Sequence, residues 1–62
     1  MNKDKKEEFI HEALDRAHMA SMHLQMALED HVVILDYEDV KEVYENAVEK
    51  IEQLYQLIGS KL

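Results

Sequence analysis

The chain has 62 residues, no cysteine and a formal net charge of -7, from seven Lys and Arg residues against fourteen Asp and Glu residues. The lack of cysteine excludes disulfides and thiolate metal sites. The acidic balance disfavours binding to nucleic acid, which needs clustered lysine and arginine, and favours a basic partner. A domain of this size buries only about 60% of the surface that its unfolded chain exposes, so we expect a second chain to stabilise it.

The first predicted element is a helix over about residues 4–31. Apolar and small residues recur there at alternating spacings of three and four, which is the a/d pattern of a helix that packs along one stripe. Asp4 followed by Glu7 is typical of a capping box at a helix start. The a/d positions are Ile10, Ala13, Ala17, Ala20, Leu24, Ala27 and His31. We call this row the alanine seam, and its small residues predict a close approach of neighbouring helices.

Four consecutive apolar residues, Val32 to Leu35, link this helix to the next. Linkers are usually polar, so we expect this run to be buried against the end of the bundle or against a second protomer. An exposed contact loop is one alternative. A short strand is another, because Val32, Val33 and Ile34 are β-branched.

The second predicted helix covers about residues 37–59. Its a/d positions are Tyr37, Val40, Tyr44, Ala47, Ile51, Leu54 and Ile58. Asp36 with Asp39 is a carboxylate variant of the capping box, and Leu35 with Val40 fits a hydrophobic staple. Gly59 stands where a left-handed residue would end the helix.

These elements predict an all-α protein with a single domain over residues 1–62. The short link predicts an antiparallel helical hairpin. Apolar residues on both sides of the two seams make each apolar stripe wider than two helices can cover, so we expect two hairpins to form a four-helix bundle as a homodimer. The sequence shows neither a run of about 20 apolar residues for a membrane span nor a signal peptide, and we expect a cytoplasmic protein without membrane contact.

Two apolar surfaces are candidates for partner binding. Met19, Met22 and Met26 form a methionine stripe on the side of the first helix away from the alanine seam. The stripe is either a packing interface of the dimer or a docking surface for another protein, because methionine is common on adaptable binding surfaces. Val33 and Ile34 in the linker offer a second apolar contact.

The second helix carries a row of acidic residues opposite its core, which we call the acidic ridge. Its members are Glu38, Glu42, Glu45, Glu49 and Glu52. They span about 21 Å at 1.5 Å per residue, and like charges at these spacings repel each other. The ridge is either a solvated face that keeps the chain soluble or a surface that binds a basic partner. In the second case the ridge can also imitate a row of phosphates.

Metal binding and catalysis have weaker support. Glu8 with His11, and Asp15 with His18, each place a carboxylate and an imidazole one helical turn apart, as in carboxylate-bridged di-metal bundles. Both pairs lie off the alanine seam, and we expect no metal and no other cofactor. The chain has no cysteine, few serines and no glycine-rich loop, so we expect no enzymatic activity.

The sequence therefore predicts a small acidic regulator or adaptor that acts as a homodimer and binds a basic protein partner, with inhibition as one mode of action. A metal-binding four-helix bundle with histidine and carboxylate ligands is the first alternative. A purely structural dimerisation module is the second.

Overall fold

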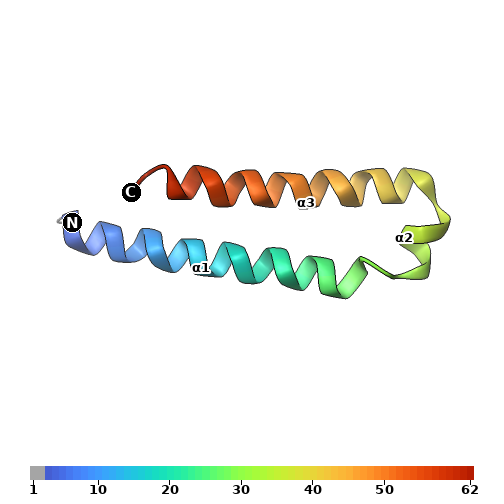
Figure 1. The fold of residues 1–62 in the computed structure, drawn as a ribbon, viewed down its shortest axis with the longest axis horizontal. Coiled ribbons are helices and arrows are strands. Elements are labelled where there is room, and N and C mark those ends of the chain that lie inside the picture. Colours follow the sequence, from blue (N-terminus) through green and yellow to red (C-terminus); the bar gives the residue numbers. More distant parts are fainter. Residues whose placement is uncertain (1–2) are drawn as a thin grey trace.

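The computed structural model describes residues 3–62, and these residues form three helices and no strand (Figure 1). Helix α1 spans Lys3–Leu28, α2 spans Val32–Asp36 and α3 spans Glu38–Gly59. α1 and α3 run antiparallel side by side, and α2 packs against α3 at the closed end. The predicted all-α class is confirmed. None of these helices has the length and apolar character of a membrane span.

The contact between α1 and α3 is a narrow strip. Its buried and half-buried side chains include Ile10, Ala13, Leu14, Ala17, Ser21, Leu24 and Gln25 on α1, and Val40, Tyr44, Val48, Ile51 and Ile58 on α3. Only two apolar side chains in the described part of the chain are fully buried, namely Ala17 at 9% exposure and Ile34 at 7%. The hairpin by itself therefore has almost no enclosed core.

The alanine seam is only partly the contact strip. Ile10, Ala17 and Leu24 face α3, whereas Ala20, Ala27 and His31 are exposed. The physical reason is the pitch of the helix, because a straight α-helix drifts by about 20° per heptad relative to a strict seven-residue repeat. Along α1 this drift carries the later alanines out of the strip and onto one side of the hairpin.

The predicted structure of the link between the long helices is wrong, because the segment after α1 forms a short helix rather than a loop or a strand. α1 ends at Leu28, and the His31 N–H donates to the Leu28 carbonyl oxygen at 3.0 Å. His31 then caps α2, since its Nδ1 accepts the Val33 N–H at 3.1 Å. The turn directs Ile34 into the hairpin and leaves Val33 exposed.

The predicted ends of the second long helix also need correction. Asp36 ends α2, and Tyr37 is the N-cap of α3 without a side-chain hydrogen bond. Gly59 is the last helical residue and does not have a positive φ angle. Ser60 closes α3, with its N–H bonded to the Gln56 carbonyl oxygen at 3.0 Å.

The capping box predicted at Asp4 and Glu7 depends on the Asp4 side chain, which lies outside the side chains that the structure describes.

We predict that Ala17→Leu lowers the free energy of unfolding by about 1–3 kcal/mol, because a larger side chain overpacks the point where α1 and α3 meet. Chemical denaturation followed by circular dichroism measures the change. Met19→Leu, at an exposed position of the same helix, is the control and should change stability by less than about 0.5 kcal/mol. Equal stability of the two variants would show that Ala17 is not in a tight contact.

The His31 cap gives a second prediction. His31→Ala removes the acceptor for the Val33 N–H and should cost about 0.5–2 kcal/mol, whereas His31→Asn keeps a capping side chain and should cost less. The same denaturation experiment measures both variants. If the alanine and asparagine variants unfold alike, the imidazole does not hold α2 in place.

Candidate interaction surfaces

One broad face of the hairpin is apolar and open to solvent. It begins where the drift of α1 carries its alanines out of the contact strip, and α3 continues it on the same side. Its members, which we call the apolar face, are Phe9, Ala13, Ala20, Ala27, Val43, Ala47 and Leu54. Phe9 is 54% exposed and Val43 is 67% exposed. Such a surface on a small protein marks a contact with another molecule.

Two shallow hollows show that α1 and α3 share this face. Near the open end of the hairpin, Phe9 and Ala13 line one hollow together with Ile58. Near the closed end, Leu28 lines the other together with Val40 and Val43. The apolar face therefore runs along most of the hairpin.

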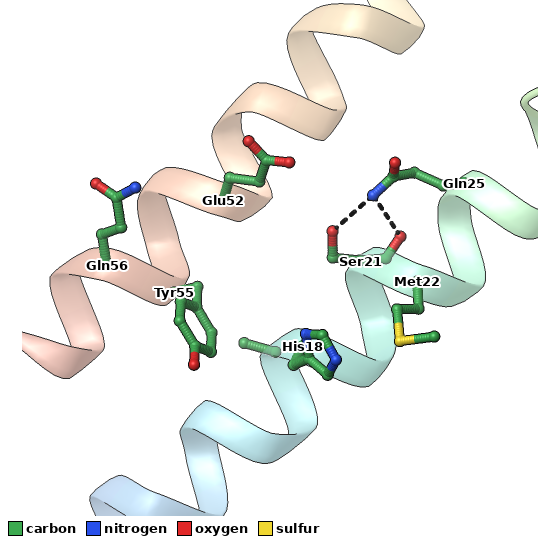
Figure 2. Close-up of a pocket in the computed structure, with 8 residues that line it drawn as sticks. His18, Ser21, Met22, Gln25, Glu52, Tyr55 and Gln56 are labelled. Atoms are coloured by element: carbon green, nitrogen blue, oxygen red, sulfur yellow. Dashed lines mark hydrogen bonds between the residues drawn. The ribbon is translucent and has the colours of Figure 1, made fainter.

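The opposite face of the hairpin carries a groove of mixed character, which we call the polar groove (Figure 2). Its first hollow, of about 260 Å³, lies between His18 and Met22 of α1 and Tyr55 of α3. The His18 and Tyr55 rings lie 6.4 Å apart between centroids, at an interplanar angle of 56°. Gln25 closes one side, where its Nε2 donates to the Ser21 hydroxyl oxygen at 3.1 Å.

The second hollow of the polar groove also contacts Gln25, so the two hollows lie on either side of this residue. Its volume is about 290 Å³, and Leu35, Lys41, Tyr44 and Glu45 line it. Burial raises the pKa of the Tyr44 hydroxyl, and the nearby carboxylates of Glu29, Asp30 and Glu45 raise it further. The groove thus combines apolar walls with hydrogen-bonding groups and negative charge.

The acidic ridge is exposed along its whole length. An ion pair joins Arg16 Nη2 to Glu12 Oε1 at 2.8 Å, on the other long helix. On the ridge, Glu49 Oε1 accepts a hydrogen bond from Gln53 Nε2 at 3.4 Å, which leaves its charge uncompensated. Lys41 lines a hollow together with Glu45, and Lys50 donates to the Gln53 side chain that also bonds Glu49. The ridge therefore presents a row of five carboxylates that these two lysines neutralise only in part.

The methionine stripe lies on the side of α1 away from the apolar face. Met19 is 60% exposed, Met22 47% and Met26 79%. Of the three, Met22 reaches the polar groove, where it lines the same hollow as Glu52 of the acidic ridge. The middle residue of the stripe and the last residue of the ridge therefore line one hollow, which neither Met19 nor Met26 contacts.

The two linker candidates differ in accessibility. Ile34 is 7% exposed and packs inward between the long helices, whereas Val33 is 42% exposed. In this hairpin, Val33 is the member of the pair that a partner can contact.

The histidine and carboxylate pairs do not converge. No three histidine, aspartate or glutamate side chains in the described region are placed to hold a metal ion. His18 lies beside Tyr55 in the polar groove instead. The roles of Gln25, Tyr44 and Tyr55 in the groove were not predicted. Tyr44 belongs to the a/d row of its helix, whereas Gln25 and Tyr55 each follow an a/d residue directly and so stand at the edge of a packed face.

Comparison with known proteins adds no assignment: no family model, curated protein or solved structure matches this chain. The inference of function therefore rests on the surfaces described above.

Tyr44 gives a prediction on pH dependence. Its pKa is raised above the ordinary value of 10.0, so folding favours the protonated phenol. The stability that this provides is fully present below pH 10 and is lost as the pH rises through the raised pKa. The contribution of Tyr44 is obtained by subtracting the absorbance titration of Tyr44→Phe from that of the wild-type protein. In the native protein this difference should have a midpoint above pH 10, and in denaturant the midpoint should fall to the ordinary value. Equal native and denatured midpoints would contradict this environment for Tyr44.

Proposed function

We propose that this chain is a small acidic regulator or adaptor that acts as a homodimer and binds a basic protein partner, which it recruits or inhibits. The observation that carries the proposal is the acidic ridge, with five exposed carboxylates in a row on α3. Stability alone favours lysines interspersed at these spacings, because like charges three and four residues apart destabilise a helix. An arrangement that destabilises the helix and brings it no structural benefit indicates that these residues serve binding.

The polar groove supports the same proposal because it adjoins the ridge. Glu52 lines the first hollow and Glu45 lines the second. Charge on the ridge would steer a basic surface toward the hairpin and set the encounter rate. Apolar side chains in the groove, Met22 and Tyr55 among them, would provide the buried anchors that set how long the complex lasts.

The two faces of the hairpin also separate assembly from recognition. The apolar face and the polar groove lie on opposite sides, so a second hairpin on the apolar face leaves the ridge and the groove accessible. The exposed apolar face alone favours a second candidate function, a structural dimerisation module whose acidic ridge serves only solubility. The two candidates differ in what happens when the charge of the ridge is reversed.

The test compares two double variants with the same net charge. Glu45→Lys with Glu49→Lys reverses the middle of the ridge, whereas Glu8→Lys with Asp15→Lys places two lysines at exposed positions of α1. A partner isolated with the wild-type protein by cross-linking in host cells is purified, and its association with each variant is followed by stopped flow. At low ionic strength the ridge variant should associate at least about tenfold more slowly, and the control should stay closer to the wild-type rate.

Added salt should slow the association of the wild-type protein with the partner more than that of the ridge variant, because the charges that salt screens are those of the ridge. Met22→Glu should instead raise the dissociation rate, since it places a charge in the apolar wall of the groove. A folded ridge variant that associates at the wild-type rate in low salt would leave the dimerisation module as the better account.

A further inference from the structure

The hairpin exposes too much surface for a protein of its mass. Its accessible surface is 5241 Å² for a chain of 7.3 kDa. A folded monomer of this mass exposes about 4,200 Å² by the usual scaling of surface with mass. About 1,000 Å² of surface is therefore in excess, and the fully buried apolar side chains of the described region are limited to two.

The apolar face has the dimensions of a stable protein interface. The molecule extends 49 Å by 16 Å in its two longer directions, which gives each broad side a footprint of about 800 Å². A standard specific interface buries about 800 Å² on each partner. A second hairpin of the same length covers this footprint completely, whereas a small ligand or a short peptide does not.

Charge also favours a second copy on this face rather than on the others. The chain has a net charge of -7, so two copies repel each other through most of their surfaces. The two hollows of the apolar face contact one charged residue each, Lys6 and Asp39, which have opposite signs. The two hollows of the polar groove contact three carboxylates, Glu29, Glu45 and Glu52, and one lysine, Lys41. Two copies that meet there keep their acidic ridges on the outside.

The sizes of the side chains along the apolar face indicate where its centre lies. Ala20 of α1 and Ala47 of α3 form a shallow middle, whereas Phe9 and Leu54 are bulkier toward the open end and Leu28 and Val43 toward the closed end. Small residues allow helix axes to approach to about 8 Å.

We infer that the apolar face is the site of self-association, and that a second copy of this chain covers it with Ala20 and Ala47 at the centre of the contact. This inference names the surface that forms the homodimer of the proposed function, and it is tested in the absence of any other protein. A two-fold axis through the centre of the face has two possible directions in its plane. One direction brings Ala20 against Ala20 of the second copy, and the other brings Ala20 against Ala47 of the second copy.

The lack of cysteine in the sequence makes the geometry directly measurable. A disulfide needs Cα atoms about 4.4–6.8 Å apart, which a close helix contact provides. Ala20→Cys and Ala47→Cys are oxidised separately and as an equal mixture. The first axis should give a covalent dimer with each variant alone, and the second should give one only in the mixture. Gln53→Cys, on the outward side of α3, is the control and should stay largely uncross-linked.

Light scattering with size-exclusion chromatography measures the assembly itself. The wild-type protein should have twice the 7.3 kDa mass of the chain. Ala20→Glu should shift it toward monomer, while Gln53→Glu, which adds the same charge outside the apolar face, should keep the mass of two copies. The cross-linking result stands independently if Ala20→Glu fails to fold.

A wild-type mass of one chain would overturn the inference. So would a dimer in which Gln53→Cys cross-links as fast as the two alanine positions, since the copies would then meet through another face. Binding of a basic partner by a protein with the mass of one chain would overturn the dimer while leaving the ridge as the binding surface.

Discussion

Two antiparallel helices can bury only the strip of each helix that faces the other, and the rest of the structure depends on this constraint. The apolar positions of α1 and α3 cover a wider arc than this strip. Ala17 is enclosed where the helices meet, while Ala20, one turn further along α1, is exposed. Because so little is enclosed, we expect conformational entropy to oppose the hairpin more strongly than its own contacts can offset. The proposed second copy would supply the missing burial by covering the apolar face.

The same geometry explains how one small chain can separate two tasks. The arc of α1 that faces away from the apolar side carries His18 and Met22, and the matching arc of α3 carries Glu52 and Tyr55. These residues form the polar groove next to the acidic ridge. In the proposed function, self-association uses one broad side and recognition of a basic protein uses the other. Neither task then blocks the other.

The sequence predicts the two long helices because their a/d patterns extend over three heptads and no proline interrupts them. It does not predict α2, because histidine is an unusual cap and His31 makes its hydrogen bond only after the chain has turned. It misplaces Ala20 and Ala27, since a strict heptad reading ignores the drift of a straight helix. The sequence also predicts a left-handed residue at Gly59, which the structure does not have. The Ser60 N–H supplies the closing hydrogen bond of α3 instead.

The candidate site is less predictable than the helices. The spacing of Glu38 to Glu52 shows an acidic row in the sequence, and the structure leaves that row exposed. The polar groove depends on how α1 and α3 are aligned, and nothing in the spacing of either helix places Met22 beside Glu52. The burial of Ile34 depends on the turn of α2 in the same way. These features arise from packing between distant parts of the chain, which local periodicity does not encode.

The dependence of thermal unfolding on protein concentration tests most directly whether the hairpin needs a second copy. For a dimer that unfolds to separate chains, mass action stabilises the folded state by about 1.4 kcal/mol for each tenfold increase in concentration. The account predicts that Tm, followed by circular dichroism, rises by roughly 10 °C over a hundredfold increase in concentration. A Tm that stays constant over that range would show that the hairpin is stable alone, and would contradict the account.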